Sequence, residues 1–489
     1  MKKVLAIDFG ASSGRAILGS FDGEKITLEE IHRFSNDPVF VGDTMYWDVL
    51  RLLFEIKQSI IKSKAYGEIE SIAIDTWGVD FGLLDKDGRL LENPVHYRDN
   101  RTKGFYKKLK SVISDNEFYS KTGIQFMEIN TVYQLMSLKE NRPDLLSRAD
   151  KMLLMPDLFC YFLTGKKVAE MSIASTTQLF DAKNKCWSDE IINALGLDRS
   201  LFPEIVDSGT VVGELSCEIC RELDVKPCKV ISVCGHDTQS AQISVNANEN
   251  DFAFLSCGTW SLLGTELSEP VLTEESLKLN VTNETGYMRK TSFLKNIIGL
   301  WLLQESKRQF AREGKNYSYA DMERMARNEK PLMCFIDPDS EEFVPAGNIP
   351  QRVKQYCKRT NQYVPKTDGE VIRCIYDSLA LKYKSAISQL EECTDKRFSK
   401  LYMVGGGTKD KLLSELSANA CGIEVSCGPV EATAFGNIAL QLIVNGKIKD
   451  LSHAREVISA SERFSVFAPE NTDMWNEAYK KYCEVTKNA

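Results

Sequence analysis

Apolar and polar positions near the start of the chain follow the short, interrupted pattern of strands rather than the longer pattern of helices. Three runs of apolar and β-branched residues predict strands, at 4–8, 15–21 and 26–34. Asp22-Gly23, between the last two runs, is a hairpin signal. After Asp48, apolar residues recur at the spacing of one buried helical face, and 69–75 predicts another strand. This order of elements predicts a mixed α/β sheet.

The opening pattern returns in the second half of the chain. Residues 252–264 again predict a strand, a turn of glycine and hydroxyl residues and a second strand, after a polar, Asn-rich segment at 244–251. A domain boundary is therefore expected there, with one domain at 1–245 and another at 246–489. The repetition suggests an internal duplication around a shared ligand cleft, although two such short matches also arise by chance.

Two turns are rich in glycine. Residues 10–15 offer small side chains, two hydroxyl groups and approachable backbone N–H groups, which suits phosphate binding, but a hairpin without a ligand explains the same residues. Later, a predicted strand at 400–404 leads into Gly405-Gly406-Gly407 and a helical pattern, the arrangement of a nucleotide-binding turn. The motif G-x-x-x-x-G-K-[ST] does not occur, which excludes a P-loop kinase.

An acidic residue, Asp237, stands between the imidazole of His236 and the hydroxyl of Thr238. It follows an apolar run that predicts a buried strand and precedes a helical pattern, so a carboxylate there is well placed to act as a general base. Its side chain could equally cap the following helix. The spacing leaves both interpretations open.

Polar residues and glycine beside apolar runs add further candidates. Gly78 follows Trp77 at a predicted strand end, where an aromatic wall and close backbone approach suit a small polar ligand; a core tryptophan beside a bulge is the alternative. Asn296 and Gln304 are predicted on one helix, about two turns and roughly 80° apart, so that both amides reach one cleft. Hydrogen bonds to neighbouring backbone are the alternative for both amides.

Composition narrows the class of protein. The chain has 489 residues, 43% of them hydrophobic, and a formal net charge of -8, which predicts a globular protein without a nucleic-acid surface or a basic membrane-binding face. The N-terminus lacks the core of a signal peptide, and no apolar run has membrane-spanning length. A cytoplasmic location is therefore expected, and the oligomeric state is left open.

The 14 cysteines are irregularly spaced and are expected to be reduced. Cys217 and Cys220 form the only tight pair, so ordinary core cysteines are favoured there over a metal-thiolate site. Cys357 and Cys374 could meet in the fold, but connectivity is not readable from the sequence.

Many ordered motifs together make the chain resemble the FGGY carbohydrate kinases over nearly its full length. The segments that carry the resemblance are 8–15, 30–34, 74–80, 236–238, 256–262, 296–304, 405–407 and 428–432. The resemblance implies two ribonuclease H-like α/β domains, of the actin, sugar kinase and heat-shock chaperone superfamily, around a central cleft that closes on ATP and a ketose. The N-terminal domain would bind the sugar and carry the base and the first phosphate hairpin, and the C-terminal domain would bind the nucleotide.

Position by position, the resemblance implies roles for individual residues. Asp237 would accept the proton of the sugar hydroxyl, and Asp8 would lie near Mg²⁺, with water between them. Besides Asp237, the residues lining the sugar would be Gly78, His236, Thr238 and Asn296. The residues around ATP would be Ala11, Ser12, Ser13, Gly14, Arg15, Thr259, Gln304 and Gly406. Residues 408–411 depart from the small or amide residues that relatives often carry, which leaves the nucleotide contacts there open.

The reaction implied by the resemblance is phosphoryl transfer from ATP to L-rhamnulose, giving L-rhamnulose 1-phosphate. Within the same class, L-fuculose and L-xylulose are alternative acceptors, because a few pocket residues discriminate between such ketoses. A non-catalytic regulator that binds ATP or sugar is the alternative from another class. Retention of Asp237 and of both glycine hairpins disfavours it, since a binding protein has no use for a base.

Overall fold

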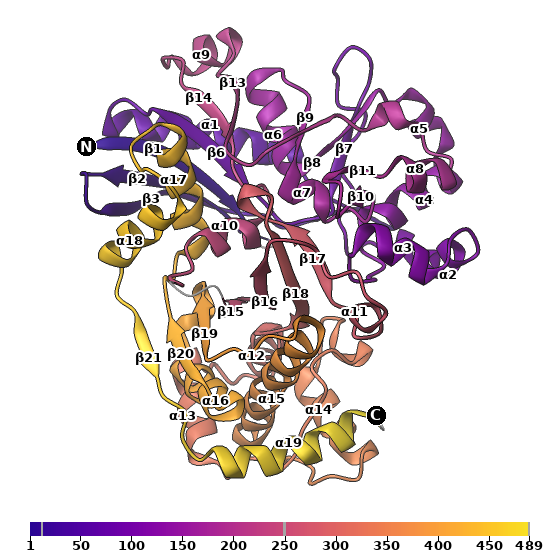
Figure 1. Ribbon diagram of the computed structural model, residues 1–489, viewed down its shortest axis with the longest axis vertical. Helices are drawn as coiled ribbons and strands as arrows, with labels where there is room; N and C mark the ends of the chain where they lie inside the picture. Colours follow the sequence, from indigo (N-terminus) through magenta and orange to yellow (C-terminus); the bar gives the residue numbers. More distant parts are fainter. Residues whose placement is uncertain (11–12, 248–250, 488–489) are drawn as a thin grey trace. The chain divides into compact units, whose positions relative to one another are not determined.

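The computed structural model describes residues 1–10, 13–247 and 251–487, and the chain folds into two compact units (Figure 1). The first unit comprises Met1–Asn246, Leu267–Phe293 and Ala432–Glu462. The second comprises Ala247–Glu266, Leu294–Glu431 and Arg463–Ala489. That residues 1–245 bind the sugar and residues 246–489 bind the nucleotide stays a prediction.

The first unit is built on a six-stranded mixed sheet with the order β13-β14-β6-β1-β2-β3. Its strands are β1 (Lys2–Phe9), β2 (Ser13–Phe21), β3 (Ile26–Ser35), β6 (Ser71–Asp75), β13 (Thr210–Glu214) and β14 (Lys229–Ser232). β1, β2 and β3 pair antiparallel, whereas β6 lies parallel to both β1 and β14. The three strands predicted at the start of the chain and the strand ending at Asp75 are thereby confirmed.

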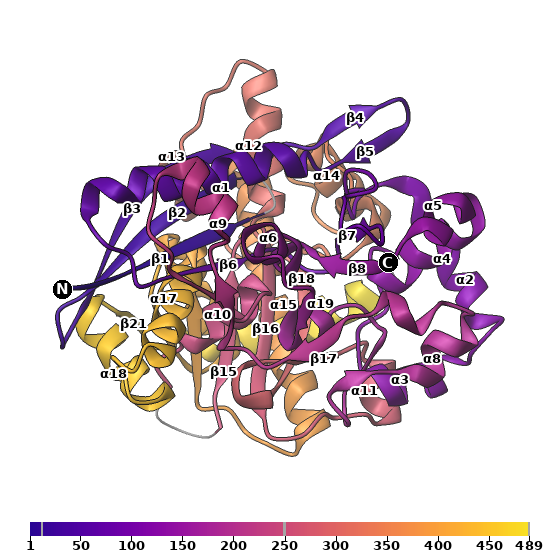
Figure 2. The same cartoon turned by 90° about the horizontal axis from the view of Figure 1, so that it is seen from above.

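Both faces of the central strands of this sheet are buried. Along β1, Leu5 and Ile7 contribute to one apolar cluster and Val4 and Ala6 to another, as expected when successive side chains point to opposite faces. Helices α1 (Val49–Ser63) and α6 (Met155–Thr164) belong to the first cluster, and α17 (Ala432–Val444) to the second. Figure 2 shows α1 and α17 on opposite faces of β1, β2 and β3.

The N-terminus of α1 confirms the predicted helix start, because the Asp48 side chain accepts a hydrogen bond from the backbone N of Arg51. The other helices of the first unit are α2 (Phe105–Lys110), α3 (Asp115–Thr122), α4 (Thr131–Asn141), α5 (Pro143–Arg148), α7 (Met171–Ser175), α8 (Asp189–Ala194), α9 (Cys217–Leu223), α10 (Asp237–Ile243), α11 (Glu274–Lys278) and α18 (Leu451–Ser461). Its short strands are β4 (Val39–Val41), β5 (Thr44–Tyr46), β7 (Phe81–Leu84), β8 (Lys151–Leu154), β9 (Val168–Glu170), β10 (Phe180–Asp181), β11 (Cys186–Trp187) and β12 (Glu204–Val206).

A seven-stranded sheet has the order β17-β18-β16-β15-β19-β20-β21. Its strands are β15 (Ala253–Cys257), β16 (Trp260–Leu267), β17 (Thr282–Thr285), β18 (Thr291–Ile298), β19 (Lys400–Val404), β20 (Glu424–Cys427) and β21 (Ser465–Phe467). β15 pairs antiparallel with β16 and parallel with β19, which is parallel to β20. This repeats the plan of β2, β1, β6 and β14 in the first unit, so the duplication suggested by the sequence extends to strand order and direction.

The helices of the second unit are α12 (Trp301–Arg312), α13 (Tyr319–Asn328), α14 (Ile349–Arg359), α15 (Asp368–Thr394), α16 (Lys411–Cys421) and α19 (Thr472–Lys487). The prediction of one helix carrying both Asn296 and Gln304 is wrong, because Asn296 lies on β18 and Gln304 on α12. Gly299 separates the two elements, and an added Cβ there would lie 2.4 Å from Ser261 Oγ. Short apolar runs suit strand and helix alike, and sheet pairing decides this one.

Among the described helices, none combines the length and the apolar character required to cross a bilayer.

Candidate active site

Three carboxylates follow three neighbouring parallel strands of the first unit. Asp8 lies at the end of β1 and pairs in register with Asp75, the last residue of β6. Asp237 begins α10, a few residues after β14 ends. Because the carboxyl ends of parallel strands meet at one edge of a sheet, this edge collects the acidic groups.

Backbone hydrogen bonds fix the turn that presents Asp237. Thr76 N donates to Gly235 O and Asp237 N donates to Thr76 O, both at 2.9 Å. Gly235 is required at this turn, since an added Cβ would lie 2.9 Å from Pro156 Cγ. The N-cap position of α10 is held by His236 and has no side-chain capping bond. The capping interpretation of Asp237 is therefore wrong, and its carboxylate, with a side chain 33% exposed, remains available to a ligand.

Electrostatics at this edge oppose full ionisation. Burial raises the pKa of Asp75 well above the usual range, and the nearby carboxylates of Asp8 and Asp237 raise it further. Burial also raises the pKa of Asp237; His236 opposes this, whereas Asp8 adds to it. Arg15 Nη2 binds Asp8 Oδ2 at 2.6 Å and supplies a compensating charge.

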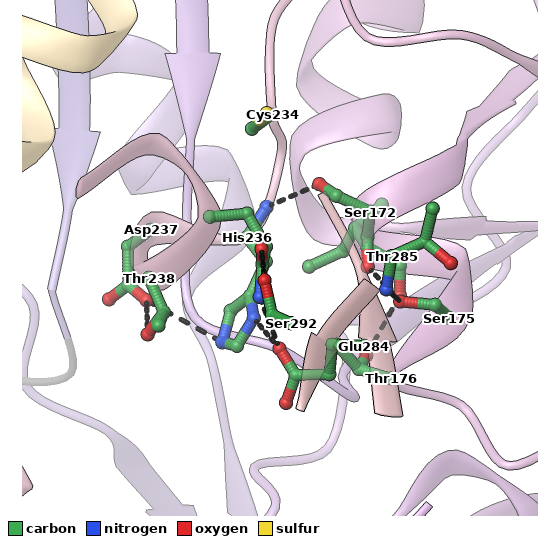
Figure 3. Close-up of polar contacts among 12 residues, drawn as sticks. Ser172, Ser175, Thr176, Cys234, His236, Asp237, Thr238, Glu284, Thr285 and Ser292 are labelled. Carbon is green, nitrogen blue, oxygen red and sulfur yellow. Dashed lines mark hydrogen bonds and ion pairs between the residues drawn. The ribbon is translucent and has the colours of Figure 1, made fainter. Parts of the chain in front are cut away.

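A buried glutamate that the sequence did not single out completes the surroundings of His236. Glu284 Oε2 lies 2.7 Å from His236 Nδ1, and Asp237 Oδ1 lies 3.5 Å from Nε2 on the opposite side of the ring (Figure 3). Burial lowers the pKa of His236, but the surrounding carboxylates, Glu284 foremost and then Asp237 and Glu170, together outweigh it and raise that pKa to about 9. Glu284 lies on β17, whose four residues are all polar and all buried. A carboxylate within such a buried strand needs a partner, and this was the one signal that could have pointed to Glu284.

Gly78 lies between β6 and β7, and an added Cβ would sit 3.3 Å from Thr176 Oγ1. Its neighbour Trp77 is 6% exposed and donates its indole N–H to the buried carboxylate of Asp80 at 2.9 Å. Burial raises the pKa of Asp80 to about 6. Trp77 therefore serves as a core tryptophan, while partly exposed Gly78 leaves backbone open to a ligand.

The first glycine turn connects β1 and β2. Gly10 N donates to Ser13 O at 2.9 Å, whereas Ala11 and Ser12 lie outside the described residues. Gly14 faces the core rather than a ligand, since an added Cβ would lie 2.3 Å from the ring of Phe34. Glycine at this position is thus explained by packing.

The equivalent turn of the second unit, between β15 and β16, is tied to the start of α12. Leu300 N donates to Gly258 O at 3.0 Å and Trp301 N to Thr259 O at 3.1 Å. Thr259 Oγ1 also donates to the side-chain oxygen of Gln304 at 3.2 Å. The structure therefore brings together Thr259 and Gln304, which are 45 positions apart.

The triple glycine follows β19 and packs against the end of β15. Gly405 has a φ of 89°, which favours glycine, and an added Cβ on Gly407 would lie 2.3 Å from Cys257 Sγ. Gly406, in contrast, has open space around its Cα. In the divergent segment after it, Thr408 Oγ1 donates to Gly405 O and Asp410 caps α16. These two side chains therefore stabilise the turn itself.

Three buried thiols, those of Cys334, Cys357 and Cys374, lie close enough together to hold a metal ion. Among the described residues they form the one group of three metal-ligating atoms within 4.8 Å of each other. Cys357 and Cys374 thus meet, as free thiols, whereas Cys217 and Cys220 belong to no such group.

The acidic edge suits an ion that keeps most of its water. Asp75 Oδ2 accepts a hydrogen bond from Asn437 at 2.5 Å, while the buried Oδ1 of Asp75 has no protein partner. The carboxylates of Asp8, Asp75 and Asp237 do not form a closed cage. Mg²⁺ typically retains several waters and takes one or two carboxylates, so Asp8 and Asp75 fit it, while Asp237 is left to the sugar.

A mixed sheet whose strand plan is repeated in a second sheet, with glycine turns after the first strand of each, is the architecture of the ribonuclease H-like fold. Residues 3–244 match the N-terminal domain and residues 253–444 the C-terminal domain of the FGGY family of carbohydrate kinases. The chain belongs to this family and is a carbohydrate kinase. The expected family and enzyme class are thereby confirmed.

Curated relatives match almost end to end. The chain is 41% identical over 475 residues to a rhamnulokinase of Bacteroides thetaiotaomicron, covering 97% of each chain. It is 39% identical over 469 residues to a rhamnulokinase of Bacillus subtilis, covering 96% of each.

Solved structures confirm the expected fold. A ligand-bound xylulose kinase from Lactobacillus acidophilus superposes with a TM-score of 0.82 at 17% identity, covering 100% of this chain and 98% of that one. A Plasmodium falciparum glycerol kinase with ADP gives the same TM-score and coverage at 14% identity.

Proposed function

We propose that this carbohydrate kinase transfers the γ-phosphoryl group of ATP to the 1-hydroxyl of L-rhamnulose, with Asp237 as the general base. The similarity to relatives named rhamnulokinase supports the choice of sugar. The observation that carries the mechanism is the placement of Asp237. Its carboxylate is partly exposed, does not occupy the N-cap position of α10 and lies beside His236.

In the proposed reaction, Asp237 takes the proton of the sugar hydroxyl as its oxygen attacks the γ-phosphorus. The new O–P bond forms while the bond from the γ-phosphorus to the β,γ-bridging oxygen breaks, and ADP leaves with that electron pair. A positioned base contributes roughly 10²- to 10⁴-fold to the rate. The rest of the acceleration comes from positioning and charge stabilisation, as is usual for phosphoryl transfer.

Mg²⁺, when bound, would neutralise charge on the phosphates. Asp8 would hold it through water, with the unpartnered oxygen of Asp75 facing the same hydration shell. Arg15 balances the charge of Asp8. Burial and the neighbouring carboxylates raise the pKa of Asp75, and a bound cation would favour its ionised form.

The remaining assignments divide between the two substrates. Gly78, His236, Thr238 and Asn296 would line the sugar. The ATP residues would be Ala11, Ser12, Ser13, Gly14, Arg15, Thr259, Gln304 and Gly406. Open space at Gly406 and the tied turn at Thr259 support backbone approach to the phosphates. Gly14 would shape the turn through its packing against Phe34.

The test is ADP release by the purified protein with Mg²⁺ across L-rhamnulose, L-fuculose, L-xylulose and D-xylulose, with a no-sugar control. We expect the highest kcat/KM for L-rhamnulose, and a ³¹P spectrum should identify the 1-phosphate as product. Preference for another ketose would replace the proposed acceptor. Absence of sugar-stimulated ADP release from folded, ATP-binding protein would contradict the proposed reaction.

A further inference from the structure

Glu284 occupies a position that acts on the proposed base through one intervening ring. Its carboxylate is 5% exposed and lies 2.7 Å from His236 Nδ1. Asp237 faces the other ring nitrogen, Nε2, at 3.5 Å. Figure 3 shows the imidazole standing between the two carboxylates.

Hydrogen-bond chemistry restricts the protonation state of this ring. A carboxylate is an acceptor, and a neutral imidazole has one N–H donor, so a neutral ring turns a lone pair toward either Glu284 or Asp237. The contact with Glu284 is a hydrogen bond, and Nε2 faces Asp237 at ion-pair distance, so an imidazolium places its positive charge between the two carboxylates. This position between two carboxylates favours a charged His236.

Further contacts hold Glu284 in place. Gln239 Nε2 donates to Glu284 Oε2 at 3.0 Å, and Ser292 Oγ donates to Gln239 Oε1 at 2.6 Å. On the same strand, Thr285 N donates to Ser175 Oγ at 2.9 Å. A buried carboxylate with this support is a fixed charge rather than a mobile one.

We propose that Glu284 is a positioning residue that keeps His236 protonated and aimed at Asp237, so that the base stays ionised at neutral pH. This inference rests on the proposed role of Asp237. The imidazolium is the charge nearer to Asp237, and Glu284 lies beyond it, so the pair as a whole stabilises the Asp237 carboxylate. The other charged groups acting on His236 or Asp237 are Glu170, Asp8 and Asp75.

The direction of the pH effect follows. Asp237 must be ionised to accept a proton, so kcat/KM falls as pH drops below the pKa of Asp237. Replacing Glu284 by Gln removes the partner that keeps His236 charged, and loss of that neighbouring cation raises the pKa of Asp237. The acid limb of the profile should therefore move to higher pH, by roughly one unit.

The first measurement does not depend on turnover. The chain has 4 His, so ¹³C-labelled histidine gives a small set of ring signals, and His236→Gln identifies that of His236. In the wild-type protein the His236 signal should titrate near 9. In Glu284→Gln it should titrate at least one unit lower. An unchanged titration would overturn the proposal, even if the natural sugar is not L-rhamnulose.

The second measurement is the pH profile of kcat/KM for Glu284→Gln, Glu284→Asp and the wild type. Glu284→Asp keeps the charge, so its His236 titration and the acid limb of its kcat/KM profile should both lie close to those of the wild type. A merely structural role of Glu284 would not predict this recovery. Glu274→Gln removes an exposed carboxylate from α11 in the same chain segment and should change neither. If Glu284→Gln fails to fold, the wild-type titration decides: a His236 signal that titrates at or below the ordinary histidine value of about 6.5 would overturn the proposal.

Discussion

The two sheets share a strand plan, yet their strand ends carry opposite chemistry. In the first unit Asp8, the last but one residue of β1, is paired in register with Asp75, the last residue of β6. The corresponding positions on β15 and β19 are Ser256 and Val404, also paired in register. After β14 comes the acidic residue of α10, whereas after β20 comes Gly428.

This difference shows how one backbone plan serves two ligands. Carboxylates suit proton transfer and a hydrated cation, both of which the first unit's edge is proposed to handle. Most of a polyphosphate is better met by backbone N–H groups at small residues, and near the carboxylates its charge would need Arg15 and Mg²⁺ to balance it. The contrast between the two units depends on a few residues at the strand ends, so substitutions at these residues can remove it or increase it.

The largest effect should come from Asp237→Asn. The amide cannot accept the hydroxyl proton, so kcat should fall by roughly 10²- to 10⁴-fold, while ATP and sugar still bind. Turnover is measured by ADP release and binding by calorimetry. Asp87→Asn, at an exposed loop of the same unit, is the matched control and should remain fully active. Near-normal turnover in Asp237→Asn would remove the proposed base.

Asp8→Asn should have the next largest effect. The amide is a weaker partner for a hydrated cation, and losing such a group typically costs about 10- to 100-fold in metal affinity or activity. A Mg²⁺ titration of ADP release should therefore shift to higher concentration. The same Mg²⁺ dependence in variant and wild type would count against a metal role for Asp8.

Ser256→Asp transfers the acidic character of the first unit to the second. A carboxylate near the phosphates should weaken ATP binding by about 1 kcal/mol, roughly fivefold in Kd, because like charges repel. Isothermal titration with ATP measures the change, and the effect should shrink as salt is raised. Ser388→Asp, at an exposed position of α15, adds the same charge as a control. Equal ATP affinity in Ser256→Asp and Ser388→Asp would contradict the placement of the ATP phosphates near Ser256.

The smallest change in ligand affinity is expected at the triple glycine. Gly406→Ala adds a methyl into open space, so thermal stability should hold while KM for ATP rises about two- to fivefold, equivalent to ~0.5–1 kcal/mol. Gly407→Ala is its partner variant, because that Cβ would overlap Cys257. Overpacking of this kind costs about 1–3 kcal/mol, which should lower the thermal midpoint. A lower thermal midpoint in Gly406→Ala together with a higher KM for ATP in Gly407→Ala would contradict the roles given to the two glycines.

Much of this architecture was predictable because it is written in local patterns. The strands at the start of the chain, the helix after Asp48 and the glycine turn after β19 all follow from periodicity and turn chemistry. Asp237 and His236 were also identifiable, because they stand together in a strand-to-helix turn. The resemblance to a family depended on the same short segments.

Other features required the folded chain. Asn296 was predicted on a helix but lies on a strand. Its apolar surroundings in the sequence suit either element, and only pairing in a sheet decides between them. The packing of Gly14 against Phe34 was likewise hidden, since those residues are partners across two strands.

The sequence by itself determined the first strands and the helix after them, the glycine turns, the family and the identity of the acid at the start of α10. The tertiary structure decided which distant groups act on that acid. Glu284 reaches His236 across 48 positions, and Asn437 reaches Asp75 across 362. Such contacts leave no periodic trace in the chain, because they depend on burial that brings a carboxylate and its partner together out of water, where an unpaired charge is too costly to persist.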